Sequence, residues 1–137
     1  EEFGLAPALE ALLERMFESV GVRVKFLCGV EGDLNPDTEV VLYRIAQEGL
    51  ANILHHAEAN LVTVELGQRG ECHYLRVEDD GVGFDTTDLS RKRSQQHLGL
   101  ISMKERSEII GGWMDLSSVP GQGTKLEVYV PQRWEES

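Results

Sequence analysis

Polar side chains recur at intervals of four residues along segment 37–57, which the sequence predicts to be a helix; they are Glu48, Asn52 and His56. Each interval advances the position around a helix by only about 40°, so the three side chains share one stripe and can face one ligand. A carboxylate beside an amide oxygen suits Mg²⁺, which keeps several waters and takes few protein ligands while phosphate oxygens supply the rest. The alternative is a polar helix face that contacts only solvent.

The adjacent pair His55 and His56 does not predict a zinc site. Neighbouring residues on a helix point about 100° apart, so both imidazoles cannot bind one ion. One imidazole beside a phosphate is chemically sounder, because its N–H donates to an anion and protonation strengthens that bond.

A second set of candidate residues ends a predicted strand, where Asp79 and Asp80 are followed by Gly81, Val82 and Gly83. The glycines permit unusual dihedral angles and close approach. A carboxylate beside them can accept a hydrogen bond from an exocyclic amine, such as that of adenine. A plain acidic turn and a calcium loop are the alternatives, but the spaced ligands and closing glutamate of an EF-hand are missing.

Glycines also occur before the third predicted helix, in His97-Leu98-Gly99-Leu100, and before the last predicted strand, in Gly121-Gln122-Gly123-Thr124. A glycine at the start of a helix leaves N–H groups open to a phosphate. A helix cap and a hairpin turn are the simpler alternatives. The patterns GxxxxGK[ST] and GxGxxG are both absent from the sequence, so any nucleotide site must be of another type.

The elements that must position these residues follow from hydrophobic periodicity and turn residues. We expect residues 1–5 to be a linker or, in part, a remnant of cloning, and residues 85–97 to be a polar loop. The predicted helices are 7–20, with Val20 on its apolar face, 37–57, and 98–110, with Met103, Ile109 and Ile110 facing inward. The predicted strands are 22–26, a hairpin of 61–66 and 74–77 turning at 67–70, and a hairpin of 113–118 and 125–130. This order predicts an α+β sandwich in which three helices cover one face of a mostly antiparallel sheet.

Composition limits the class of protein. The chain has 137 residues and a net charge of −11, which fits one globular domain and disfavours a nucleic-acid partner, because phosphate binding needs a basic face. Charged residues interrupt every window of eighteen, so we expect no membrane insertion. Cys28 and Cys72 lie outside any CxxC pair or zinc cluster, which predicts two buried free thiols in a reducing cytosol.

Taken together and in this order, the segments resemble the four sequence boxes of the ATP-binding catalytic domain of bacterial sensor histidine kinases. The similarity is greatest to the branch paired with helix-turn-helix response regulators. The boxes correspond to 43–57, 79–85, 97–106 and 121–124, and they extend over nearly the whole chain.

The resemblance implies a Bergerat-type two-layer sandwich over residues 1–137, with a mixed sheet, ATP and Mg²⁺ as cofactors, and residues 85–97 as a mobile ATP lid. It implies that Asn52 and Glu48 are the catalytic and metal-binding residues. It assigns nucleotide binding to Asn52, His55, His56, Asp79, Gly81, Val82, Gly83, Gly99, Leu100 and Thr124. Within that set, Asp79 would accept from the adenine amine and Thr124 would be a polar wall beside it. Two positions depart from the family pattern: His55 stands where Lys or Arg is frequent, and His97 replaces the first glycine of a frequent G-x-G-L.

The function that the resemblance implies is transfer of the γ-phosphoryl group of Mg-ATP to a histidine on a separate dimerisation domain, upstream of a response regulator. Such a domain is cytoplasmic. His73 lies in a predicted strand and the other histidines lie in the boxes, so we expect the acceptor to lie outside this chain. The alternatives are a hydrolytic ATPase of the same superfamily and a non-catalytic, ATP-dependent binding switch, such as an anti-sigma-like protein or a degenerate kinase.

Overall fold

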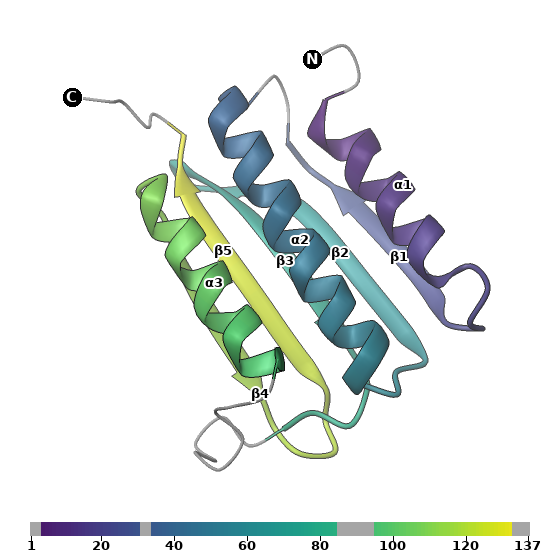
Figure 1. Ribbon diagram of the computed structural model, residues 1–137. Helices are drawn as coiled ribbons and strands as arrows, with labels where there is room; N and C mark the ends of the chain where they lie inside the picture. The colour runs from purple at the N-terminus through teal and green to yellow at the C-terminus, as the bar shows by residue number, and fades with distance from the viewer. Residues whose placement is uncertain (1–3, 31–33, 85–94, 133–137) are drawn as a thin grey trace.

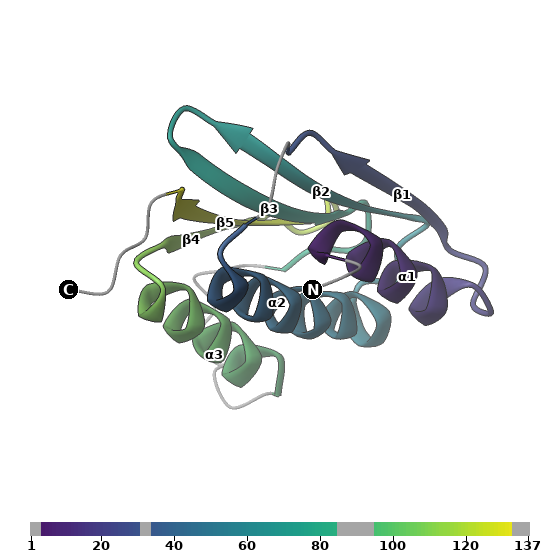
Figure 2. The same ribbon diagram turned by 90° about the horizontal axis from the view of Figure 1, so that it is seen from above.

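The computed structural model describes residues 4–30, 34–84 and 95–132, of which 95–97 are described by their backbone only. Within these residues, three helices form one layer and a five-stranded sheet forms the other (Figures 1 and 2). The helices are α1 (Leu5–Phe17), α2 (Pro36–His56) and α3 (Gln95–Ile109). The strands are β1 (Arg23–Cys28), β2 (Leu61–Arg69), β3 (Cys72–Asp79), β4 (Trp113–Ser118) and β5 (Thr124–Pro131). The predicted α+β sandwich, with its helices on one face of the sheet, is confirmed.

The sheet has the strand order β1-β2-β3-β5-β4. The pair β1 and β2 is parallel, and the other pairs are antiparallel. In this register Asp79, the last residue of β3, is the partner of Thr124, the first residue of β5. The residues that the sequence places far apart in two boxes therefore meet at one end of the sheet.

The helix α2 is central in the layer, between α1 and α3 (Figure 1). Its start is well defined, because the Asn35 side chain accepts a hydrogen bond from the Asp37 N–H at 2.8 Å and Pro36 occupies the first turn. Its apolar stripe packs on alternate residues of the central strands. This core includes Leu42, Ile45, Leu50, Val62, Val64, Leu75, Val77, Leu126 and Val128.

The sheet face opposite to the helices carries a row of aromatic and charged side chains. The indole of Trp113 stacks on Tyr129 with ring centroids 5.4 Å apart, and Tyr129 lies 5.8 Å from Tyr74. The ring of Tyr74 covers Gly67, where an added Cβ would overlap it. The prediction of a turn over residues 67–70 is therefore wrong in part. Gly67 is a strand residue paired with Tyr74, and the strands extend to Arg69 and Cys72.

Both ends of α1 and both ends of α3 differ from prediction. The helix α1 begins at Leu5, inside the segment expected to be a linker, and Leu5 is buried. It ends at Phe17, so Val20, expected on the apolar face, is exposed. The helix α3 starts at Gln95 rather than at residue 98, and its last residue, Ile109, expected inward, is 72% exposed because only Ile110 turns into the core.

Both cysteines are free, as expected, but they are not buried: Cys28 is exposed at the edge strand β1 and Cys72 is partly exposed. Among the described residues, no helix is both long and apolar enough to cross a membrane. Residues 85–94, which make up most of the predicted lid, lie outside the described part of the chain.

Candidate functional site

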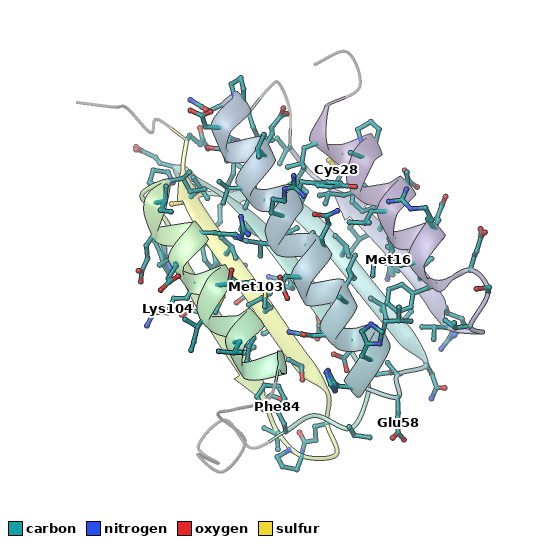
Figure 3. All side chains as sticks on the ribbon, viewed as in Figure 1. Met16, Cys28, Glu58, Phe84, Met103 and Lys104 are labelled. Atoms are coloured by element: carbon teal, nitrogen blue, oxygen red, sulfur yellow. The ribbon has the colours of Figure 1, made fainter. Side chains whose placement is uncertain are left out.

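A cavity opens where α2, the end of β3, the first half of α3 and the β4–β5 hairpin meet. Figure 3 shows Met103 of α3 and Phe84 in this region. Phe84 follows Gly81-Val82-Gly83, which we call the glycine segment. The residues that line the cavity come from all of these elements: Gly49, Asn52, Ile53, His56, Ala57, Val77, Asp79, Gly83, Phe84, Leu100, Met103, Leu116, Thr124 and Leu126. Of the predicted site residues, this set contains Asn52, His56, Asp79, Gly83, Leu100 and Thr124.

A second hollow lies between the C-terminal half of α2 and the start of α3. Its lining consists of Glu48, Ala51, Asn52, His55, His56, Leu98, Gly99 and Ser102. Because Asn52 and His56 line both hollows, the stripe of side chains spaced by four faces α3 and forms the common border. The mostly apolar cavity and the polar hollow therefore adjoin each other at Asn52 and His56.

The carboxylate of Asp79 is the charged group of the apolar part, and only 5% of the residue is exposed. Its Oδ1 accepts a hydrogen bond from the Gly81 N–H at 2.7 Å. Burial nevertheless raises the pKa of Asp79 above its ordinary value, and the neighbouring charges of Asp80 and Glu78 act in the same direction. The apolar cavity therefore holds a hydrogen-bond acceptor in its wall.

The next residue, Asp80, has a different environment. It is exposed, and its Oδ1 accepts hydrogen bonds from the backbone N–H groups of Leu61 at 2.9 Å and Asn60 at 2.8 Å. These bonds lower the pKa of Asp80. Its carboxylate therefore ties the end of β3 to the start of β2, and it does not line the cavity.

The glycine segment is held between α2 and the β4–β5 turn. The Val82 N–H donates to the Ala57 carbonyl at 2.7 Å, and the Gly121 N–H donates to the Val82 carbonyl at 2.6 Å. An added Cβ at Gly81 would overlap the Ala57 carbonyl, and Gly83 combines a φ of 64° with an equally close approach to the β4–β5 turn. Side-chain-free positions are thus required here by packing.

Gly99 was expected near the first turn of its helix, but α3 begins at Gln95 and Gly99 lies inside the helix. An added Cβ there would lie 2.8 Å from Oε2 of Glu48. The carboxylate of Glu48 therefore lies against the start of α3 at Gly99, and a larger side chain at that position would require Glu48 to move.

Ser118 is a further residue beside the cavity, and it is not among the residues predicted from the sequence. Its hydroxyl accepts a hydrogen bond from the Phe84 N–H at 2.8 Å and lies 2.8 Å from the hydroxyl of Thr124. One signal in the sequence could have indicated it. Ser118 continues the alternation of the partly buried Met114 and Leu116 along β4, so it is a polar residue at an inward-facing position.

Divalent metal binding at this site would use few protein ligands. In the described part of the chain, no three His, Cys, Asp or Glu residues come close enough together to bind an ion. Asn52 and Glu48 line the same polar hollow, and an amide oxygen with one carboxylate fits Mg²⁺ when phosphate oxygens complete its coordination.

Comparison with known proteins gives one family and several relatives. Residues 37–133 match the family model described as histidine kinase-, DNA gyrase B-, and HSP90-like ATPase. The chain is 35% identical over 135 residues to the signal transduction histidine-protein kinase/phosphatase DegS of Bacillus subtilis, covering 96% of this chain and 35% of the relative. It is 40% identical over 96 residues to the sensor protein VraS of Staphylococcus saprophyticus, covering 70% of this chain and 26% of the relative. The chain thus spans about a third or less of these relatives.

Two solved structures share the fold. The blue-light activated histidine kinase of Erythrobacter litoralis EL346 superposes with a TM-score of 0.77 at 20% identity, covering 94% of this chain and 42% of that one. The histidine kinase AdeS of Acinetobacter baumannii superposes with a TM-score of 0.72 at 13% identity, covering 94% of this chain and 64% of that one.

Proposed function

The chain belongs to the family of histidine kinase-, DNA gyrase B- and HSP90-like ATPases, and we propose that it binds Mg-ATP and donates the γ-phosphoryl group to a histidine on a separate dimerisation domain. The observation that carries this proposal is the buried carboxylate of Asp79 in the wall of a mostly apolar cavity. A flat base with an exocyclic amine matches that combination of apolar walls and one acceptor.

The adenine would enter the apolar part of the site. Leu100, Met103 and Leu126 supply apolar walls, and Asp79 would accept a hydrogen bond from the amine. Thr124, the strand partner of Asp79, provides a second polar group beside it. Gly81, Val82 and Gly83 would bound the base, and of these three Gly83 lines the cavity.

The phosphates would lie in the adjoining polar hollow. Asn52 and Glu48 would bind Mg²⁺, and His55 and His56 would approach the phosphates from the end of α2. When bound, the ion neutralises charge that develops on the transferred group. We propose Asn52 and Glu48 as the catalytic residues of this chain.

Transfer to a histidine is favoured over ATP hydrolysis because the relatives with the highest identity named above are histidine kinases or sensor proteins. Since the chain spans only part of those relatives, the acceptor would lie on a dimerisation domain of the same kinase, and a response regulator would receive the phosphoryl group next. We assign the domain to the cytoplasm, where ATP is the available phosphoryl donor.

Calorimetric titration with ATP, with and without Mg²⁺, tests the nucleotide site. We expect one ATP to bind per chain and Mg²⁺ to strengthen binding. The variant Asp79→Asn should lose at least about tenfold in affinity, since it presents an amide donor in place of one carboxylate oxygen. Asp80→Asn is the matched control, because it makes the same chemical change one residue away, outside the cavity, and it should bind ATP like the wild type. Equal affinity of both variants and the wild type would contradict the assignment of Asp79.

A further inference from the structure

The hydroxyl group of Ser118, at the end of β4, joins three parts of the site wall. It accepts a hydrogen bond from the backbone N–H of Phe84 at 2.8 Å and donates one to the carbonyl of Gly123 at 3.1 Å. Its oxygen also lies 2.8 Å from the hydroxyl oxygen of Thr124. The contacts connect the glycine segment, the β4–β5 turn and the first residue of β5.

The number of protons that each group can donate determines the direction of the hydrogen bond between Ser118 and Thr124. A serine hydroxyl has one proton to donate and two lone pairs that accept. The Phe84 N–H can only donate and the Gly123 carbonyl can only accept, so the Ser118 proton is used on Gly123. The arrangement that satisfies all three contacts makes Thr124 the donor to Ser118. With its single proton committed, the Thr124 oxygen offers lone pairs to a ligand.

The same oxygen lies beside another acceptor. Asp79 and Thr124 are partners on neighbouring strands, so their side chains are on one face of the sheet, and both residues line the cavity. An ionised carboxylate can only accept hydrogen bonds. This wall therefore presents acceptors from two strands, which suits a ligand edge that carries N–H donors.

Purine nucleotides differ at this edge. At position 6 a 6-amino purine offers two N–H donors and its N1 accepts, whereas a 6-oxo purine presents a carbonyl oxygen and its N1–H donates. A carbonyl facing two acceptors is desolvated without a donor, which costs binding free energy.

We infer that Ser118 is a positioning residue for nucleotide selection: it holds Thr124 as an acceptor and thereby makes the site prefer a 6-amino purine nucleotide to a 6-oxo purine nucleotide. The inference rests on the proposed function, since it requires ATP to bind in this cavity. Asp79 supplies one part of the preference directly, and Ser118 supplies the other part through Thr124.

The dissociation constants of ATP and inosine triphosphate, measured by calorimetry, test this inference. In Ser118→Ala the Thr124 hydroxyl is free to turn and donate to a 6-oxo group, so the preference for ATP should fall about three- to tenfold. Ser118→Thr keeps a hydroxyl and should retain the preference of the wild type. Ser117→Ala is the matched control, because Ser117 is the exposed neighbour on the same strand.

A second variant keeps the test decisive should Ser118→Ala fail to fold. Thr124→Val removes the hydroxyl with little change of shape, so it should lower the preference for ATP by a similar factor. In that background, Ser118→Ala should change the preference no further, because its effect acts through Thr124. An unchanged preference in Ser118→Ala or Thr124→Val overturns the inference while ATP binding stands. A wild-type chain that binds neither nucleotide overturns the proposed function as well.

Discussion

Asp79 and Asp80 are adjacent in the chain, but their carboxylates have opposite environments. Asp79 is buried in the cavity wall, whereas Asp80 is exposed and accepts hydrogen bonds from the N–H groups of Leu61 and Asn60. Burial raises the pKa of Asp79, and the two backbone hydrogen bonds lower the pKa of Asp80. The ionised form of Asp79 therefore destabilises the fold, whereas the ionised form of Asp80 stabilises it.

The first prediction concerns the stability of Asp79→Asn. The folded-state pKa of Asp79 is raised, so its protonated form favours folding, and that effect is lost as the pH rises through the raised pKa. At neutral pH the buried charge costs stability. Asparagine removes this charge and keeps an Oδ1 that can accept the Gly81 N–H. We expect Asp79→Asn to raise the Tm at pH 7 in the absence of nucleotide.

Thermal unfolding as a function of pH checks this sign. The difference in Tm between Asp79→Asn and the wild type should shrink as the pH falls toward about 4, where the unfolded carboxyl also takes up its proton. Asp80→Asn should behave in the opposite way and lower the Tm at pH 7, because it weakens hydrogen bonds that favour the ionised form. A Tm for Asp79→Asn below that of the wild type at pH 7 would show that its carboxylate stabilises the fold.

The second prediction concerns Asn52, which lines both hollows of the site. If its amide oxygen acts through Mg²⁺, Asn52→Ala should weaken Mg-ATP binding by about tenfold or more while changing adenosine binding without metal far less. Gln47→Ala removes an amide from the same helix outside both hollows, and it is the control. Equal losses for both ligands in Asn52→Ala would argue against a role through the ion.

The third prediction concerns the close approach of Gly81 to α2. An added Cβ would overlap the Ala57 carbonyl, so Gly81→Ala should lower the free energy of unfolding by about 1–3 kcal/mol. Gly29→Ala is the control, because nothing lies within 4 Å of its added Cβ. Denaturant unfolding measures both variants, and equal stabilities would contradict the packing described for the glycine segment.

The fourth prediction concerns Arg76, whose substitution should change the stability of the fold without changing ATP binding. On the sheet face opposite to the helices, Arg76 donates to Glu127 at 2.8 Å and to Glu65 at 2.7 Å. Arg76→Met would leave two carboxylates without this partner and should lower the free energy of unfolding by about 1–2 kcal/mol, with a smaller loss in Arg76→Lys. Since neither glutamate lines the cavity, the dissociation constant of ATP should stay unchanged. A large loss of ATP affinity would mean that this face is coupled to the nucleotide site.

Sequence alone predicted the helix α2 and its stripe of Glu48, Asn52 and His56, because helical periodicity depends on local spacing. It could not distinguish Ile109 from Ile110 as the buried residue, since both fall near the end of a pattern and tertiary packing decides between them. The sequence predicted a turn at Gly67, because glycine is typical of turns. Inside β2 this glycine makes room for the ring of Tyr74 on the next strand, and that contact appears only when the strands pair.

In the candidate site, too, local sequence patterns predicted some residues, whereas the environment of others depends on tertiary contacts. The sequence predicted Asp79 as a site residue, but its difference from Asp80 depends on where the chain places the N–H groups of Asn60 and Leu61. The partners of Ser118 come from the glycine segment and the β4–β5 turn, so its role appears only once these segments are brought together.

Transfer of label from γ-³²P-ATP tests whether this chain donates the phosphoryl group to a histidine on another domain. Phosphoryl transfer depends on positioning and electrostatics, and the acceptor histidine would lie outside this chain. We expect this chain alone to bind ATP but to acquire no label and to release little inorganic phosphate. When the dimerisation domain of the proposed kinase is added, that domain should acquire acid-labile phosphohistidine, and it should acquire far less with Asn52→Ala. Label on this chain by itself, or rapid release of phosphate without the added domain, would contradict the account and favour a hydrolytic ATPase.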